Sequence, residues 1–490
     1  MSFSEEEINL LESDLLLSSE IKKSDLNIDL INFIKKQHPD ILFIDKEFLE
    51  KVKLELNVFK EKENSFDNDI FIEINSFNEE SRKRTFEDFV GFFNSRFEQL
   101  SSVLKQRQDL QGLTSINRVA VKQDRELVAV IGLVKEKSIT KNNNIILVVE
   151  DQTGQIPILI SKNNSDLLSI GKDIVLDEVI GITGSSGKNI IFANNIIFPD
   201  VPLNKEFKKG PRDVYSIFLG DTHFGSKVFL KEEFEKFIKW INGEIGSFEQ
   251  KEMAKKVKYI FFAGDLVEGV GIYPDQENDL EVKDIKNQYK IMAKYFSQIP
   301  KNIKIIISPG NHDAIGIAEP QKKIYKDFAE ELFEMENVIF VSNPVNICIE
   351  KTEDFSGFDI LIYHGYSLIY YADNVESIRV AGGQKRVDLI MQFLLKRRHL
   401  APTHESNQSI PSGDKDYLVV DKIPDFFVTG HIHRASASNY RNITLLNCSC
   451  WTDITTDQEK RGLEPQPGKI FLVNLQTRKV KQMSFFHKKE

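Results

Sequence analysis

The spacing of apolar residues changes its period along the chain. Near the N-terminus apolar side chains recur at helical spacing, and Ser4 with Glu7 fits a capping box in front of them. Residues 24–37 and 46–60 repeat this pattern. The spacing predicts a small helical module over residues 1–60. That module is either a packed appendage or a unit that docks a partner, and the pattern leaves both open.

Residues 61–82 are polar and show little periodicity, which predicts a linker. From residue 83 to residue 108, apolar side chains such as Phe89 and Phe93 fall on one face of a predicted helix. The cations of this region either lie on a solvated face, which is the simpler interpretation, or contact phosphates. These cations are Arg82, Lys83, Arg84, Arg96, Lys105 and Arg107.

A different pattern covers residues 116–200, where short β-branched runs alternate with polar turns. Five or six such strands predict a small barrel, so residues 83–205 form one unit of leading helix and barrel. The segment Glu150–Gly154 between two strands resembles the strand-turn-strand signature of OB-folds. Few aromatic residues are present to stack bases, which favours a scaffold over a barrel that binds a single strand.

From residue 212 to residue 490, apolar strands alternate with amphipathic helices, which predicts an α/β layered domain. The predicted helices cover residues 230–248, 282–298, 321–335 and 384–397. The predicted strands are Val214–Leu219, Tyr259–Ala263, Ile303–Ser308, Val338–Val341, Ile360–Tyr363, Phe426–Thr429, Ile443–Leu446 and Ile470–Val473.

Short polar motifs follow directly on five of these apolar strands. Because α/β sheets gather ligands at the carboxyl ends of their strands, the motifs are expected to converge on one site. Their residues are imidazoles, carboxylates and one amide, the donors that a pair of divalent ions prefers. The motifs are Gly220-Asp221-Thr222-His223, Gly264-Asp265-Leu266-Val267-Glu268, Gly310-Asn311-His312-Asp313, His364-Gly365 and Gly430-His431-Ile432-His433.

Composition narrows the class of protein. The formal net charge of −10 argues against a protein that grips DNA alone, because such proteins usually carry a basic surplus. Three cysteines suit a reducing compartment. No long apolar run predicts a transmembrane helix, and the acidic N-terminus is unlike a signal peptide. We therefore expect an intracellular, cytoplasmic protein without membrane contact.

The order of the motifs resembles that of calcineurin-like metallophosphoesterases. The resemblance implies that Asp221, His223 and His433 hold one metal ion. It implies that Asn311, His364 and His431 hold the other, with Asp265 bridging the two. His312 has no metal role in that family, and it is placed to stabilise charge or protonate the leaving oxygen, with Asp313 orienting it. Two manganese ions are the expected cofactors, although magnesium or another divalent ion is an alternative.

The whole arrangement resembles the small subunit of archaeal family D DNA polymerases. It implies a multidomain α+β fold with a small helical module, an OB-like barrel and a C-terminal α/β layered metallophosphoesterase domain. It also implies a proofreading 3′–5′ exonuclease that is partnered with a large catalytic polymerase subunit and DNA, associated with the nucleoid, with a sliding clamp reached through the complex. Two alternatives stay open: a non-enzymatic assembly subunit, and a stand-alone phosphoesterase for small phosphates.

Overall fold

The computed structural model describes residues 43–55, 71–119, 124–455 and 464–486, together with isolated positions at 16–18, 21, 30, 34, 122, 458, 459 and 462. The chain divides into two compact units. One comprises Met1–Phe71 with Lys351–Asp354, and the other comprises Ile72–Glu350 with Phe355–Glu490. The barrel and the strand-rich C-terminal region therefore belong to one unit, whereas the sequence predicted them as separate domains.

Part of the N-terminal helical prediction can be compared with the structure. Residues 46–55 are helical, as the spacing predicted. However, Leu16–Leu17 and Phe43–Ile44 form strands β1 and β2, which pair in parallel. Most of the predicted module over residues 1–60 lies outside the described residues, so its helical character as a whole stays a prediction.

The predicted linker over residues 61–82 is wrong for its second half. Phe71–Ser76 forms strand β3, which lies at the edge of a six-stranded sheet beside β13 (Val345–Lys351). The Ser342 hydroxyl accepts a hydrogen bond from the Phe77 backbone N–H at 2.8 Å, and the Ser342 N–H donates to the Ser76 hydroxyl. Polar side chains on an edge strand hide it from a periodicity argument.

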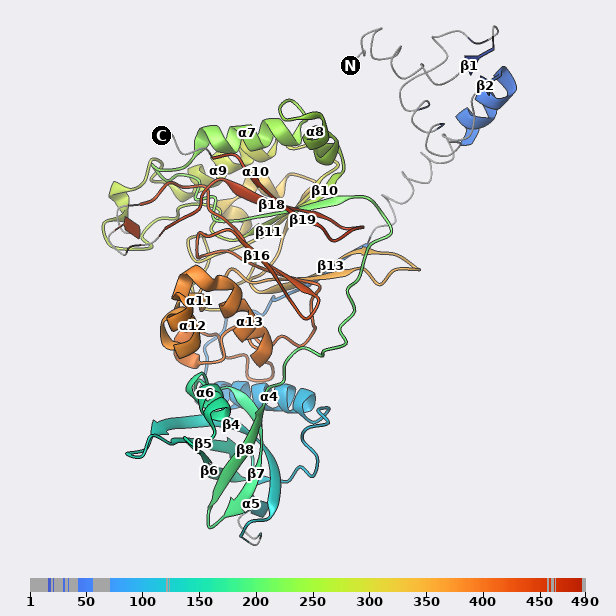
Figure 1. Cartoon of the computed structure of the whole chain (residues 1–490). Helices are drawn as coiled ribbons and strands as arrows, with labels where there is room; N and C mark the ends of the chain where they lie inside the picture. The colour runs from blue at the N-terminus through green and yellow to red at the C-terminus, as the bar shows by residue number, and fades with distance from the viewer. Residues whose placement is uncertain are drawn as a thin grey trace. The chain divides into compact units, whose positions relative to one another are not determined.

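The structure contains both the leading helix and the barrel that the sequence predicted. Helix α4 covers Phe86–Leu104, and its Thr85–Asp88 capping box explains why it begins there. Five strands close into a barrel in the order β4-β5-β6-β8-β7 (Figure 1). Their bounds are Leu127–Ile139, Ile145–Asp151, Gly154–Ile160, Val179–Gly187 and Ile190–Ile197 for β4 to β8, with short helices α5 at Ile116–Val119 and α6 at Ser165–Lys172.

The turn between β5 and β6 depends on one carboxylate. Asp151 pairs with Gly154 across the hairpin, and its side chain accepts hydrogen bonds from the Thr153 and Gly154 backbone amides. The same carboxylate accepts the N–H of Ile116, so it also fastens the segment that precedes the barrel. These local contacts explain why the Glu150–Gly154 signature is readable in the sequence.

The C-terminal region is built on two six-stranded sheets. Their strand orders are β12-β11-β10-β9-β18-β19 and β16-β17-β15-β14-β13-β3. The first sheet comprises β9 Tyr215–Leu219, β10 Val257–Ala263, β11 Lys304–Ser308, β12 Val338–Phe340, β18 Lys469–Asn474 and β19 Val480–Ser484. The second adds β14 Phe358–Ile362, β15 Phe426–Thr429, β16 Ser436–Tyr440 and β17 Ile443–Asn447.

Helices cover one face of each sheet. Side chains of α7, α8 and α9 share a buried core with alternate residues of β9, β10 and β11. Those of α11 and α13 share another with β14, β15 and β17. On the facing sides, Phe218 of the first sheet stacks on Phe426 of the second at 5.8 Å. The helices are α7 Lys231–Ile241, α8 Phe248–Lys255, α9 Ile285–Phe296, α10 Glu330–Phe333, α11 Leu368–Asn374, α12 Glu376–Ala381 and α13 Val387–Arg397.

The helix predicted over residues 321–335 is largely wrong. Only a 3-10 turn at Lys326–Phe328 and one turn of α10 form there. Gln321 instead pairs with Asn343 through backbone hydrogen bonds. The predicted helix at 230–248 ends at Ile241, because the following Asn242–Gly246 stretch contains two glycines with positive φ.

Arg96 of α4 is buried, so the interpretation of its helix face as solvated is wrong at this position. Its Nε lies 2.7 Å from Asp416 Oδ2, and both side chains are almost fully buried. His399 Nε2 lies 2.9 Å from the same carboxylate oxygen. This cluster joins the leading helix to the loop before β15, which accounts for the single compact unit.

Two further features bear on partners. Within the described ranges, the structure contains no helix that is long and apolar enough to cross a membrane. The C-terminal Gln482–Phe486 stretch is largely built into the fold. Met483 lies in β19, and Phe485 packs on Trp240 and Trp451.

Candidate metal centre

Five loops bring the predicted ligands together at the carboxyl ends of strands from both sheets. Asp221 and Asp265 follow β9 and β10, and Asn311 follows β11. His364 follows β14, and the His431 loop follows β15. Since β9, β10 and β11 run parallel, as do β14 and β15, the ends of each set lie along one edge of its sheet.

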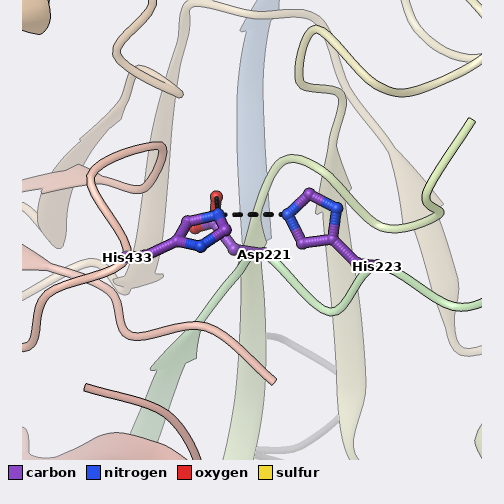
Figure 2. A group of neighbouring side chains, drawn as sticks. All are labelled: Asp221, His223 and His433. Carbon is purple, nitrogen blue, oxygen red and sulfur yellow. Dashed lines mark hydrogen bonds and ion pairs between the residues drawn. The ribbon is translucent and has the colours of Figure 1, made fainter. Parts of the chain in front are cut away.

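One group of donors consists of Asp221, His223 and His433, whose ligand atoms all lie within 4.8 Å of one another. The Nε2 atoms of the two histidines face each other at 3.1 Å (Figure 2). His433 Nε2 also lies 3.4 Å from Asp221 Oδ1. All three side chains are buried or nearly so. This is the first predicted ligand set, assembled from two loops 210 residues apart.

The second group consists of Asp265, His364 and His431, again with ligand atoms within 4.8 Å. The Asn311 side-chain oxygen lies 3.1 Å from His364 Nε2, which places the amide beside this group. The predicted second ligand set is therefore also brought together.

Asp265 lies between the two groups. Its Oδ2 is 3.2 Å from His364 Nε2 of the second group and 3.9 Å from His223 Nε2 of the first. Its Oδ1 accepts the backbone N–H of His312 at 2.8 Å. Burial opposes ionisation, but the charge of His364 and its hydrogen bond outweigh it and hold the pKa of Asp265 well below the usual range. The Asp265 carboxylate therefore lies between the two donor groups, and its role as a bridging ligand stays a prediction.

The donor set fits a pair of divalent ions. His364 Nδ1 lies 2.8 Å from the Ala263 carbonyl oxygen, so Nδ1 carries the proton and the Nε2 lone pair is free to bind a cation. His223 Nδ1 lies 3.1 Å from the Glu268 carboxylate, which directs its Nε2 in the same way. Imidazole rings oriented by an oxygen acceptor behind them are typical of metal ligands.

A proton competes for the same donors. Burial alone disfavours a charged His364, but the nearby Asp265 carboxylate overrides it and raises the pKa of His364 to about 10. Because a ligating imidazole must lose this proton, occupation of the site by a cation is expected to weaken as the pH falls.

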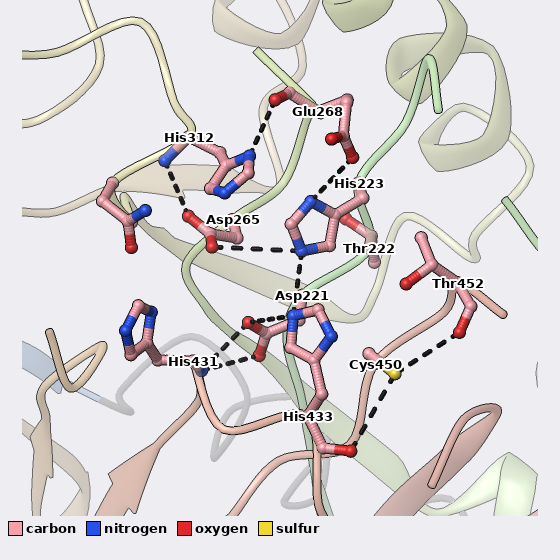
Figure 3. A network of polar contacts seen from close by, with 12 residues as sticks. Asp221, Thr222, His223, Asp265, Glu268, His312, His431, His433, Cys450 and Thr452 are labelled. Atoms are coloured by element: carbon pink, nitrogen blue, oxygen red, sulfur yellow. Dashed lines mark hydrogen bonds and ion pairs between the residues drawn. The ribbon is translucent and has the colours of Figure 1, made fainter. Parts of the chain in front are cut away.

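His312 and Asp313 differ in their surroundings, and Figure 3 shows those of His312. His312 Nδ1 lies 2.8 Å from the Glu268 carbonyl oxygen, which leaves its Nε2 able to exchange a proton. Asp313 accepts hydrogen bonds from Tyr289 and from the Gly310 backbone. The direct orienting contact predicted between Asp313 and His312 is therefore wrong. Asp313 fixes the loop, and burial raises its pKa to about 7.

The ligand loops have strained backbones. Asp221, Asp265 and His431 have φ of 51°, 48° and 68°, a region that non-glycine residues rarely adopt. The neighbouring glycines are tightly packed as well. A Cβ at Gly310 would collide with the Asp265 carboxylate, and one at Gly430 with that of Asp221. Strain of this kind persists where the surrounding fold holds functional groups in place.

Two residues that contact the donor histidines were not predicted as part of the site. Glu268 lies at the third position after Asp265, and its carboxylate supports His223. Its position inside a ligand motif was the signal that could have revealed it. The side-chain amide of Gln458 lies 2.9 Å from His433 Nδ1, and no motif marks it. Both line a pocket of about 720 Å³ that opens onto the ligand atoms.

Comparison with known proteins places the chain in a family. Residues 217–438 match the family described as the B subunit of DNA polymerase alpha/epsilon. Among solved structures, an archaeal phosphodiesterase aligns with 55% of this chain and 99% of its own at 13% identity. Its TM-score of 0.27 is too low to support an argument about fold.

Curated relatives are much more similar. A DNA polymerase II small subunit of Archaeoglobus fulgidus is 40% identical over 384 residues, covering 78% of this chain and 74% of the relative. That of Methanothermobacter thermautotrophicus is 36% identical, covering 81% and 79%. That of Methanocaldococcus jannaschii is 40% identical, covering 80% and 64%. The chain therefore belongs to the family of DNA polymerase II small subunits.

Proposed function

We propose that this chain is the 3′–5′ exonuclease subunit of an archaeal replicative DNA polymerase. The observation that carries the proposal is the convergence of two donor groups around Asp265 at one pocket. Membership of the family of DNA polymerase II small subunits supports a role within a polymerase complex. The donors supply the hydrolytic chemistry, because paired cations with imidazole and carboxylate ligands act on phosphodiesters.

Two divalent ions fit these donors, and manganese is the proposed pair because mixed nitrogen and oxygen ligation suits it better than magnesium. Asp221, His223 and His433 would hold one ion, and Asn311, His364 and His431 the other, with Asp265 shared. When bound, such ions supply Lewis-acid charge neutralisation and an activated water.

His312 is the proposed catalytic residue of the chain itself. Burial lowers the pKa of its imidazole, so the ring is neutral before substrate binds. The negative charge of a bound phosphodiester would favour the protonated ring. With Nδ1 held by the Glu268 carbonyl, Nε2 is then the atom that donates a proton to the departing 3′-oxygen.

The proposed partners are a large catalytic polymerase subunit and DNA, with a sliding clamp reached only through that complex. Because Phe485 is packed into the core, a clamp contact through the C-terminal stretch has no support. The proposed location is the cytoplasm, on the nucleoid, where a replicative polymerase works.

One alternative has an observation in its favour. The match to the family of polymerase alpha/epsilon B subunits supports a non-enzymatic assembly role, for which a complete ligand set has no use. The filled ligand positions therefore weigh against assembly as the sole role. A stand-alone phosphoesterase for small phosphates is disfavoured by the closed barrel and by the family.

A nuclease assay tests the proposal. The purified full chain is incubated with manganese and a strand that is labelled at its 5′ end, and products are resolved by length. Stepwise shortening from the 3′ end, absent without the metal, is the expected result. If the strand stays intact at saturating manganese, both with the chain and with its complex with the large subunit, the nuclease proposal is refuted. The non-enzymatic assembly role would then be favoured.

A further inference from the structure

The pocket at the metal centre has an acidic wall on one side. The segment after β10 contributes Glu268, Asp275 and Asp279 to its lining. Tyr273 donates its hydroxyl toward both Glu268 and Asp279, at 3.2 and 3.0 Å. Phosphates of a bound strand would be repelled along this wall, since like charges in a partly enclosed groove oppose each other. A polynucleotide is therefore expected to leave the centre away from Asp275 and Asp279.

A second pocket, of about 380 Å³, adjoins the first. Gln384 and Ile432 line both pockets, so the two are contiguous. Three cations line the second one: Arg379 of α12, Lys385 of the 3-10 helix at Gly383–Arg386, and Arg434. Two carboxylates, Asp373 and Glu464, line it as well, so the cations outnumber the anions by one. Arg434 directly follows the predicted ligand His433, so the loop after β15 contributes both to the metal centre and to this basic pocket.

We propose that this basic pocket binds the backbone phosphate upstream of the scissile one in a single DNA strand whose 3′ end lies at the metal centre. The inference rests on the proposed nuclease function and adds to it the path of the substrate. Guanidinium and ammonium groups are the side chains that contact phosphate oxygens most strongly. Ile432, shared by both pockets, offers an apolar surface between the two phosphates.

Glu464 also lines this pocket and pairs with two of its cations. Its carboxylate lies 3.0 Å from Lys385 Nζ and 3.7 Å from an Arg434 guanidinium nitrogen. The Glu464 side chain is 63% exposed, so the ion pairs are weakly held and a phosphate can displace them. A phosphate bound to these cations would therefore compete with the Glu464 carboxylate.

The path also accounts for a chain with a net charge of −10 that acts on DNA. A phosphate track built from three cations adds a local attraction without a basic surplus elsewhere. It reads no base, so it accepts any sequence at the 3′ end, as an enzyme that removes misincorporated nucleotides requires.

The test compares the full chain with an Arg379→Ala/Lys385→Ala double variant and with Glu464→Gln. Lys481→Ala serves as the matched control, because Lys481 is also an ion-paired lysine, with Glu249 at 3.2 Å, and lines neither pocket. Affinity for a fluorescent oligodeoxythymidylate is measured in EDTA at several salt concentrations. Manganese-dependent hydrolysis of bis(p-nitrophenyl) phosphate, which has a single phosphodiester, reports on the metal centre alone.

The double variant is expected to bind the oligonucleotide about tenfold more weakly, with a salt slope reduced by about 0.7 for each phosphate that no longer meets a cation. Its hydrolysis of the small diester and its thermal unfolding should equal those of the parent. Glu464→Gln should bind the strand more tightly, and the control should change neither reading.

Equal affinity and equal slope for the double variant would overturn the inference, whatever the chain hydrolyses. Loss of the small-diester reaction together with strand binding would also overturn it, because the cations would then serve the metal centre itself. If Glu464→Gln bound the strand with the affinity of the parent, the Glu464 carboxylate would not compete with a phosphate, and that part of the inference would be overturned. Failure of the proposed function gives a different result: no hydrolysis of either substrate by the parent, with the difference in strand binding still present.

Discussion

At the scale of single residues, Asp265 has the most demanding position, because one carboxylate lies between both donor groups. We predict that Asp265→Ala abolishes manganese-dependent nuclease activity, since no neighbouring side chain can replace an oxygen shared by two ions. The measurement is the cleavage rate together with bound manganese by elemental analysis. Asp213→Ala, an exposed carboxylate paired with Lys256, is the control. Activity within about tenfold of the parent would refute the bridging role.

His312 and His431 separate catalysis from metal binding. His312→Ala is expected to retain its metal and lose about 10²–10⁴-fold in rate, the usual contribution of a general acid. His431→Ala should instead lower metal occupancy, because its ring belongs to the second donor group. Elemental analysis beside single-turnover rates distinguishes the two. A metal-free His312→Ala with a fully loaded His431→Ala would reverse the roles.

The residues that could be predicted from the sequence share one property. Asp221, Asp265 and Asn311 each follow an apolar strand directly, and strand ends meet at one edge of a sheet. Glu268 and Gln458 act through a neighbour and differ from ordinary polar residues only in three dimensions. The hydrogen bond between Asp313 and Tyr289 could not be predicted for the same reason, because adjacency in sequence suggests His312 instead.

At the scale of elements, the sequence pattern predicted the buried strands of the sheets but not the edge strand β3. Strands β10 and β11 are nearly all apolar because they are covered on both faces, and both were predicted. Strand β3 carries polar residues at the sheet edge, where the sequence pattern predicts a linker. Helix α4 was predicted from its apolar face, but the burial of Arg96 depends on Asp416, which lies 320 residues away.

The Arg96–Asp416 contact provides a prediction at this scale. Arg96→Ala leaves a buried carboxylate without its cation, so we expect the free energy of unfolding to fall by about 3–5 kcal/mol. Arg107→Ala, just beyond α4 and paired with the half-exposed Asp109, should cost less than about 1 kcal/mol. Denaturant unfolding of both variants measures this. An equal loss of unfolding free energy in both variants would show that the buried Arg96–Asp416 pair stabilises the contact between α4 and the loop before β15 no more than an exposed pair does.

The same pair predicts a pH dependence. Burial opposes ionisation of Asp416, but His399 and Arg96 hold its pKa below the usual range. A carboxyl with a lowered folded-state pKa stabilises the fold above its unfolded pKa of about 4, and this stability is lost as the pH falls. The difference in unfolding free energy between the parent and Arg96→Ala should therefore be complete at neutral pH and narrow below about pH 4. A constant difference down to about pH 3 would contradict the assignment.

At the scale of the whole molecule, the predicted N-terminal module of residues 1–60 is expected to be dispensable for hydrolysis. The donors around the metal centre all come from residues beyond 220. A chain that lacks residues 1–60 keeps β3 in its sheet and should cleave DNA at the parent rate per bound metal. A shorter chain that begins at Arg82 loses β3 and serves as the destabilised comparison. A well-folded 61–490 chain that binds manganese but cuts no DNA would show that the N-terminal module takes part.

Assembly with a large subunit should change how the chain meets DNA. The net charge of −10 and the acidic wall beside the metal centre leave only the short basic track to attract a strand. We therefore predict that the isolated chain binds a primer-template weakly and that the complex binds it much more tightly. The dependence of affinity on salt should steepen by about 0.9 for each duplex phosphate that the partner neutralises. Binding measured at several salt concentrations for the chain, the large subunit and the complex decides this. Equal affinities and equal slopes for the chain and the complex would mean that this chain carries its own duplex site, and since its net charge opposes such a site, a further basic surface would then have to exist.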